Sequence, residues 1–255
     1  MSRLQERLYD LYSKHYQRVL PETDPRQLRS VERSSLDRSF GHLLRDRRAR
    51  GPVLDLGCGT GRLLYWLSSY PGIIPVGVDA SECQTKVARE CLPGFDISCA
   101  NGLSFLKTRP NAFSGIFCFD VLEHLPGDDL LLEWVEACRS ALKSDGFFCC
   151  RVPNAGSLIG SFDRYVDLTH QRAFTGSSLL QLLEAAGFSD PSLLGIKEGR
   201  AIGRIRAFLG NVLSRSIYFL ASGSVPKFSV FTTSVAAVGR VASSDDNGAV
   251  QKSNP

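Results

Sequence analysis

The sequence lacks several features that mark specialised classes of protein. Its eight cysteines include no Cys-x-x-Cys pair, so a structural zinc site is not expected. No run of about 18 uncharged apolar residues could span a bilayer, and the first residues hold no apolar core of a signal peptide. The net charge is only +4, which does not favour a nucleic-acid partner. We therefore expect a cytoplasmic chain whose thiols are reduced.

The sequence does contain a glycine-rich turn between a short apolar run and a helical pattern. Val53 to Gly61 reads Val-Leu-Asp-Leu-Gly-Cys-Gly-Thr-Gly. Glycine tolerates the unusual backbone angles of such a turn and lets a ligand approach the backbone. A dinucleotide site would need its third glycine at Arg62, so the spacing differs from that motif. The next apolar run ends at Asp79, where a carboxylate can accept both hydroxyls of a ribose.

From residue 52 onward, apolar runs alternate with helical patterns, which predicts an α/β fold with a parallel sheet and right-handed crossovers. The predicted strands are 52–57, 75–79, 96–100, 115–119 and 146–152. The predicted helices are 61–70, 81–91, 102–108, 128–143 and 176–186. Two later apolar stretches, 192–196 and 228–241, would form an antiparallel hairpin.

The ends of the chain are predicted to differ from this alternating region. Two polar helices, 3–20 and 24–48, would form an N-terminal helical cap over residues 1–50. The main domain would cover 51–242. The last residues, 243–255, are rich in Ser, Asp, Asn and Gly and are predicted to be disordered.

The glycine turn resembles the first motif of the class I S-adenosylmethionine (SAM)-dependent methyltransferases. That resemblance implies a Rossmann-like, seven-stranded, mostly parallel sheet with helices on both faces. It also implies SAM as cofactor and S-adenosylhomocysteine as product. A second motif, Asp-Leu-Thr-His-Gln-Arg-Ala-Phe-Thr over 167–175, resembles methyltransferases of bacterial glycan and O-antigen biosynthesis. The resemblance covers roughly residues 50–240, and its second motif is the more specific.

Ligands of open α/β sheets bind beyond the carboxyl ends of the strands. The residues expected to contact the cofactor are Asp55, Gly57, Cys58, Gly59, Gly61, Asp79, Ala80, Asn101, Gly102, Phe119 and Asp120. Many members of the family carry Asp at position 101, where it binds the adenine amino group. Asn101 departs from that pattern, but its side-chain carbonyl can accept the same hydrogen bond.

The run Glu123-His124-Leu125-Pro126 resembles the fourth-strand end of small-molecule methyltransferases. The motifs of DNA base methyltransferases are absent there. We therefore expect a small-molecule or glycan acceptor, such as a sugar or related hydroxylated metabolite, including lipid-linked forms. A quinone-like or lipid-ring acceptor is the alternative enzyme function. A SAM-binding pseudoenzyme that serves as a partner subunit is the alternative from another class.

Methyl transfer to a hydroxyl needs a base, and an imidazole titrates near neutral pH. His170 is the first candidate, with Asp167 beside it to orient the ring. His124 is the second, although a structural hydrogen bond that locks its turn is the favoured explanation of that residue. Asp120, Glu123 and His124 also resemble, more loosely, a divalent-metal cluster of some quinone-biosynthesis methyltransferases. No metal is expected, and Mg²⁺ is kept only as the less favoured alternative.

Residues 200–221 are predicted to form an amphipathic helical insertion. Apolar residues recur at helical spacing from Ile202 to Phe219, and arginines stand at 200, 204, 206 and 215. A basic amphipathic helix can lie on an anionic membrane, here the inner face. A helix packed on its own domain or on a dimer partner is an equal alternative, and the sequence does not specify an oligomeric state.

Overall fold

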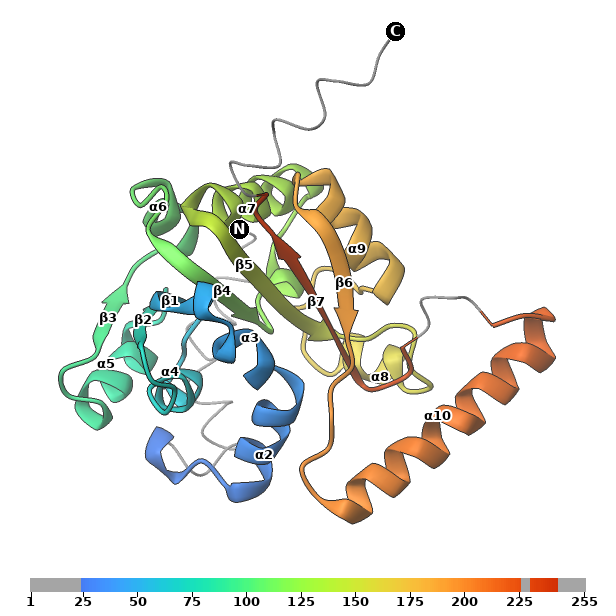
Figure 1. Cartoon of the computed structure of the whole chain (residues 1–255). Coiled ribbons are helices and arrows are strands. Elements are labelled where there is room, and N and C mark those ends of the chain that lie inside the picture. The colour runs from blue at the N-terminus through green and yellow to red at the C-terminus, as the bar shows by residue number, and fades with distance from the viewer. Residues whose placement is uncertain (1–23, 226–229, 243–255) are drawn as a thin grey trace, which may run out of the picture.

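The computed structural model describes residues 24–225 and 230–242 (Figure 1). The predicted helix over 3–20 and the predicted disordered tail therefore lie outside the described residues. Seven strands form one sheet in the order β3-β2-β1-β4-β5-β7-β6. They are β1 (Gly51–Leu56), β2 (Ile73–Asp79), β3 (Asp96–Cys99), β4 (Phe113–Phe119), β5 (Leu142–Pro153), β6 (Ser189–Leu194) and β7 (Ser234–Arg240). β7 runs antiparallel to the other six strands, so the predicted fold class is confirmed.

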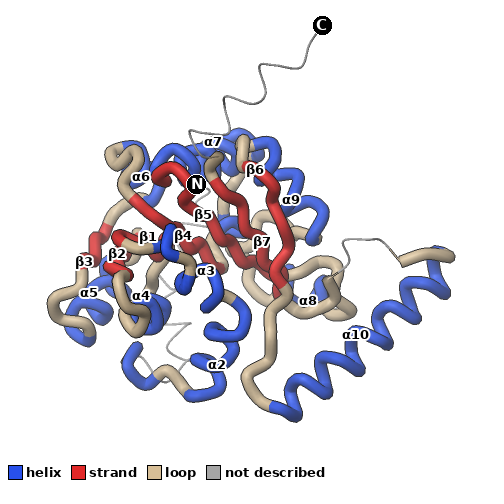
Figure 2. Tube along the Cα trace, viewed as in Figure 1, coloured by secondary structure: helices blue, strands red, loops and turns tan. Residues whose placement is uncertain are grey.

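Helices cover both faces of the sheet (Figure 2). The helices of the parallel region are α4 (Arg62–Leu67), α5 (Glu82–Cys91), α6 (Gly102–Lys107), α7 (Asp128–Ala141) and α9 (Gly176–Ala185). Successive strand residues point to opposite faces. On β1, Val53 belongs to the apolar core beside α4, whereas Leu54 belongs to the core beside α6, α7 and α9.

The single helix predicted over 24–48 is wrong. The chain forms four short elements there: η1 (Pro25–Gln27), α2 (Ser30–Ser39), α3 (Gly41–Arg45) and η2 (Arg47–Ala49). The break falls at Phe40, whose φ of −124° leaves helical geometry. It allows Phe40, Leu43 and Leu44 all to be buried against the sheet. Burial of these side chains outweighs the propensity for one continuous helix.

Polar contacts tie α2 to the helix that follows the glycine turn. The Asp37 carboxylate accepts hydrogen bonds from Trp66 Nε1 at 2.8 Å and from the Tyr70 hydroxyl at 2.6 Å. Arg62, which occupies the position of the absent third glycine, donates to Glu32 at 2.5 Å. The N-terminal helices thus pack on α4, close to the glycine turn.

Several boundaries shift, and two short helices were not predicted. The short helix η3 (Leu122–His124) follows β4, and α8 (Gly160–Tyr165) lies in the loop after β5. The β6 and β7 strands are joined through α10 (Ala201–Ser222), which extends away from the sheet in Figure 1. Among the described residues, no helix is both long enough and apolar enough to cross a membrane.

Candidate active site

The glycine turn follows β1 directly and is held by the neighbouring strand. The backbone N–H groups of Gly57 and Cys58 both donate to the carbonyl of Val78, at 2.8 and 3.0 Å. Gly57 has a φ of +86°, and a Cβ there would lie 2.4 Å from the Val121 side chain. This position therefore requires glycine both for its backbone angle and for the close approach of the loop after β4.

Asp79 stands at the end of β2 and faces this turn. Its Oδ2 accepts from the backbone N–H of Gly59 at 2.9 Å, and its Oδ1 accepts from that of Ser81 at 2.8 Å. Burial raises the pKa of Asp79, while these two backbone hydrogen bonds oppose the rise. Each carboxylate oxygen can accept a second hydrogen bond. The side chain can therefore hold the turn and still accept from a ligand's hydroxyl groups.

Asp55 is the second carboxyl group of this edge and is buried, with 3% of its surface exposed. Its Oδ2 has no hydrogen-bond partner among the described residues. Burial, reinforced by the charge of Asp79 and opposed by Arg151, raises the pKa of Asp55 to about 8. Burial likewise raises the pKa of the Cys58 thiol, which lies in the same turn. Burial therefore favours the protonated form of both groups.

Asn101 and Gly102 have structural contacts that the sequence did not indicate. The side-chain carbonyl oxygen of Asn101 accepts a hydrogen bond from the backbone N–H of Ser104 at 3.1 Å and so caps α6. A Cβ on Gly102 would lie 2.7 Å from Trp134, so this glycine permits α7 to pack closely. The hydrogen bond from Asn101 to an adenine stays a prediction, and the cap occupies part of its acceptor capacity.

At the end of β4, Asp120 adopts a φ of +57° and forms an ion pair with Arg151 on β5. The Arg151 guanidinium also lies over the Phe119 ring, 4.6 Å from its centroid. Phe119 in turn contacts Phe40, with ring centroids 4.8 Å apart. Phe119 therefore packs between the sheet and the N-terminal helices, whereas Asp120 pairs with β5. Ala80 lies beside Asp79, where its carbonyl accepts a contact from the Cys99 thiol.

The structure brings His124 and His170 together, with ring centroids 4.8 Å apart. His170 Nδ1 lies 3.1 Å from the Asp163 carbonyl, an oxygen that can only accept. The Thr169 hydroxyl donates to Asp167 at 2.7 Å and lies 2.9 Å from His124 Nδ1. Since that hydroxyl has a single hydrogen, His124 Nδ1 must be the donor. These contacts place a hydrogen on Nδ1 of each ring.

The expected pairing of Asp167 with the His170 ring is corrected by these contacts. The Asp167 carboxylate accepts from the backbone N–H and the hydroxyl of Thr169, and reaches His124 through that hydroxyl. Burial opposes ionisation, but the Thr169 hydrogen bonds and the two histidines leave the pKa of Asp167 below its usual value. Burial, together with the charge of His170, lowers the pKa of His124.

The loop that carries these residues is fastened to the segment after β4. The backbone N–H of Gln171 donates to the Glu123 carbonyl at 2.7 Å. The Arg172 guanidinium donates to the Gly127 carbonyl at 2.7 Å and to the Asp128 carboxylate at 2.8 Å. Arg172 therefore holds the loop in place.

Glu123 is 1% exposed, and neither carboxyl oxygen has a hydrogen-bond partner among the described residues. Burial, with the charge of Asp120 added, raises the pKa of Glu123 well above its ordinary value. One ligand atom each from Glu123, His124 and His170 lie within 4.8 Å of one another. A carboxylate and two imidazoles form a donor set that suits several divalent metals. Asp120 pairs with Arg151 instead, so the geometric trio differs from the predicted Asp120–Glu123–His124 cluster.

Two polar residues of this region were missed from sequence. Thr169 is 2% exposed and joins Asp167 to His124, which the spacing Asp-x-Thr-His could have suggested. Asn154 is fully buried, and its Nδ2 donates to the carbonyls of Val230 and Thr232 at 2.6 and 2.8 Å. Those carbonyls are more than seventy residues away, so no local signal in the sequence could have revealed the contact.

Comparisons with known proteins establish the family of this chain. The model of a methyltransferase domain family matches residues 14–193, and the chain belongs to that family. It is 27% identical over 195 residues to a probable S-adenosylmethionine-dependent methyltransferase of Mycolicibacterium smegmatis, covering 76% of this chain and 74% of that protein. The chain is a SAM-dependent methyltransferase, which confirms the predicted enzyme class and cofactor.

The chain is also similar to a second known protein and to a solved structure. A ubiquinone biosynthesis O-methyltransferase of Neisseria meningitidis is 27% identical over 125 residues, which cover 47% of this chain and 50% of that enzyme. The crystal structure of a SAM-dependent methyltransferase from Archaeoglobus fulgidus superposes with a TM-score of 0.62 at 22% identity. That match covers 82% of this chain and 94% of the other, and it supports the fold.

Proposed function

We propose that the chain transfers the methyl group of SAM to a hydroxyl group of a sugar or a related small hydroxylated metabolite. Lipid-linked glycans belong to this acceptor class. The observation that carries the proposal is the pair of histidines at 4.8 Å, in which the Asp163 carbonyl holds Nδ1 of His170. An imidazole that is neutral at physiological pH can take the proton of a hydroxyl as the new C–O bond forms.

For the cofactor, we propose that SAM lies against the glycine turn with its ribose hydroxyls at Asp79. The unsubstituted backbone of the turn leaves room for the methionine part of the ligand. The remaining contacts are proposed for residues around the same strand ends. These residues are Asp55, Cys58, Gly59, Gly61, Ala80, Asn101, Gly102, Phe119 and Asp120.

Methyl transfer from a sulfonium is an in-line displacement that releases a neutral thioether. The leaving group needs no acid, so the enzyme must align the reactants and remove the proton of the nucleophile. We assign the base to His170, which lies in the loop after β5; both histidines are partly buried. The Asp163 carbonyl fixes the His170 ring. The His124 ring packs against the His170 ring and is held by the Thr169 hydroxyl.

A second candidate is methylation of a quinone-like ring with the help of a divalent cation. It is favoured by the trio of Glu123, His124 and His170 and by the similarity to an enzyme named for ubiquinone biosynthesis. In that case the trio would hold the ion, which would lower the pKa of the acceptor's hydroxyl. Glu123 would then have to lose the proton that burial favours.

In the test, the full chain is incubated with SAM and, separately, with pools of sugars, lipid-linked glycans or catechol-type ring compounds. Release of S-adenosylhomocysteine and a product one methylene heavier by mass spectrometry identify the acceptor. We expect turnover with a hydroxylated sugar and no effect of a chelator. Turnover only on ring compounds, lost with chelator and restored by Mg²⁺, would establish the second candidate. SAM binding without turnover on any pool would contradict both.

A further inference from the structure

The helix α10 has an apolar surface that the rest of the described chain leaves uncovered. Within this helix only Gly203 and Ser214 are buried. Ile202 is 75% exposed and Leu220 is 83% exposed. The other exposed apolar side chains are Ile205, Phe208, Leu209, Val212, Leu213, Ile217, Tyr218 and Phe219. A contiguous exposed apolar surface of this kind marks a contact with a membrane or another protein.

Most of the exposed apolar residues are on the side of α10 that faces away from the protein, whereas Ile217 and Tyr218 are on the inner side. Residues seven or eleven apart share a helix face, so the buried Gly203 and Ser214 define the inner side. Ile205, Val212 and Phe219 are spaced by seven and fall on the opposite side. The outer face is therefore apolar along the whole length of the helix.

The helix is fastened to the protein at its beginning. The Ser35 hydroxyl of α2 donates to the Lys197 carbonyl at 2.7 Å, and the Lys197 N–H donates to the Ser39 hydroxyl at 2.8 Å. Near its end, Tyr218 contacts Phe231, with ring centroids 6.0 Å apart. These attachments hold α10 to the protein while its outer face stays uncovered.

The charges of α10 are all of one sign. Arg204, Arg206 and Arg215 lie on the helix and Arg200 immediately precedes it, whereas no Asp or Glu occurs from 199 to 223. By helical position, Arg204 and Arg215 lie on one edge of the apolar face and Arg206 lies on the other. Both edges of the apolar surface are therefore positively charged.

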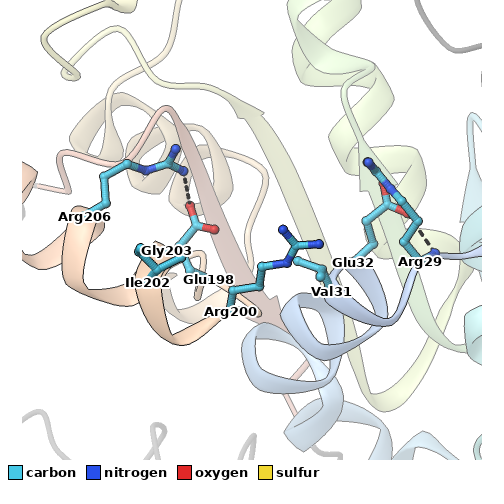
Figure 3. A pocket seen from close by; sticks show the side chains of 8 residues that line it. All are labelled: Arg29, Val31, Glu32, Glu198, Arg200, Ile202, Gly203 and Arg206. Atoms are coloured by element: carbon cyan, nitrogen blue, oxygen red, sulfur yellow. Dashed lines mark hydrogen bonds and ion pairs between the residues drawn. The ribbon is translucent and has the colours of Figure 1, made fainter.

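A cleft at the start of α10 adds to this charge (Figure 3). It has a volume of about 330 Å³ between α10 and α2, and Arg29, Arg200 and Arg206 line it. Arg29 pairs with Glu32 at 2.7 Å and Arg206 pairs with Glu198 at 3.3 Å, so arginine exceeds acid by one. An apolar groove of about 430 Å³ continues from the cleft along the helix, because Ile202 and Arg206 line both.

We propose that α10 docks the protein on the surface of an anionic lipid bilayer. The apolar outer face enters the boundary between headgroups and acyl chains, and the arginines on both edges bind lipid phosphates. The arginine-lined cleft takes a headgroup where the apolar groove begins. An apolar face edged with cationic side chains is the arrangement that binds such surfaces.

A second copy of this chain fits the surface less well. Two α10 helices packed face to face would bring together arginines from both copies, with no acidic side chain on either helix to pair with them. Like charges held close together oppose association. A bilayer rich in anionic lipid supplies the opposite charge along the whole helix.

The experiment measures co-sedimentation of the full chain with phosphatidylcholine vesicles that contain or lack phosphatidylglycerol. We expect binding to the anionic vesicles at low salt, weak binding to the neutral ones, and a steep fall as salt is added. Arg204→Glu/Arg206→Glu should weaken binding at least about 30-fold, since each arginine near an anionic leaflet contributes roughly fivefold. Leu209→Ser/Leu213→Ser should weaken it further on vesicles of either kind.

The matched control is Arg47→Glu/Arg48→Glu, which changes the net charge equally at two exposed arginines on η2. Binding that this control reduces as much as the α10 variant does would overturn the proposal, because net charge alone would explain it. Failure to co-sediment at low salt would overturn it too. The proposal would also be overturned if sedimentation equilibrium without lipid showed a dimer and Leu209→Glu dissociated that dimer. SAM binding, measured on every variant, reports on folding and is expected to stay unchanged.

Discussion

The two halves of the candidate active site are built in different ways. The half proposed for the cofactor consists of one turn after β1 and the end of the neighbouring strand, joined by backbone hydrogen bonds such as that from Gly59 to Asp79. The half proposed for the acceptor joins segments far apart in sequence: Thr169 meets His124 across 45 residues. The first half is set by local backbone conformation and strand pairing, whereas the second depends on side-chain contacts between loops.

This difference predicts how changes in each half will act. A turn made of backbone atoms suits a ligand that is the same for every member of a family. Loops held by side chains such as Arg172 can be altered without disturbing the sheet, so they are suited to an acceptor that varies. Changes in the first half should alter SAM affinity for any acceptor, and changes in the second should alter turnover at constant SAM affinity.

The largest effect is expected for His170→Ala. Loss of a positioned base should lower turnover by roughly 10²–10⁴, with SAM affinity nearly unchanged because the ring lies outside the glycine turn. Initial rates of S-adenosylhomocysteine release and calorimetric titration with SAM measure the two quantities. Equal losses of turnover and of SAM affinity would show that the acceptor half is not separate from the cofactor half.

His124→Ala is the companion variant. Its ring is partly buried and hydrogen-bonded to Thr169, so we expect a loss of unfolding free energy before a loss of turnover. If a folded His124→Ala enzyme is inactive while His170→Ala turns over normally, the roles are reversed. A chelator then separates a metal-bound ring from a metal-free base.

The next effect concerns Asp55 and pH in the protein without ligand. Its folded pKa of about 8 lies above its unfolded value, so between about pH 4 and 8 the unfolded chain releases this proton and the folded chain keeps it. Stability contributed by the protonated group is therefore lost as pH rises. Relative to Asp55→Asn, which cannot ionise, the natural protein should lose a few kcal/mol across that window.

Urea unfolding of both proteins at about pH 5 and about pH 8 measures the difference, which isolates Asp55 from the other titrating groups. A difference that stays constant with pH would mean that Asp55 titrates alike in the folded and unfolded chains. The cofactor half would then not include a buried neutral carboxyl group, and an interaction with the nearby Arg151 would have to offset its burial.

Asp79→Ala tests the cofactor half directly. The variant removes an acceptor for two ribose hydroxyls, and a charged hydrogen bond contributes about 1.5–3 kcal/mol, so SAM affinity should fall at least tenfold. Asp96→Ala, at an exposed carboxylate that begins β3, is the matched control and should bind normally. Unchanged affinity in a folded Asp79→Ala protein would place the ribose elsewhere.

The features that could be predicted from the sequence are those set by local pattern, and the features that were missed depend on contacts between distant segments. The apolar runs predicted every strand of the sheet because the pattern is local; it is strongest in the central parallel strands, such as β1 and β4, which are mostly buried. The helix over 24–48 was predicted wrongly because the break at Phe40 is set by burial against β4, a contact that no local pattern records. The short helices η3 and α8 give too few turns for a helical period to be visible.

In the candidate site, the position of Asp79 beside the glycine turn was predictable because adjacent parallel strands end at the same edge. The partner of Asp167 was not. The sequence places Asp167 three residues from His170, and only the conformation of the loop directs the carboxylate to Thr169 and so to His124. The two histidines come from segments whose approach depends on Gln171 and Arg172 reaching the chain after β4.

Thr169→Val is the smallest change and the sharpest test of the acceptor half. Valine keeps the shape of the buried side chain but removes the hydroxyl that links Asp167 to His124, while the backbone bond to Asp167 remains. Loss of one such hydrogen bond is worth about 1 kcal/mol, so turnover should fall roughly fivefold with SAM affinity unchanged. Thr169→Ser restores the hydroxyl and should recover most of the rate. If serine is as impaired as valine, packing of the threonine methyl positions the histidines, and the Asp167–Thr169–His124 link does not contribute to turnover.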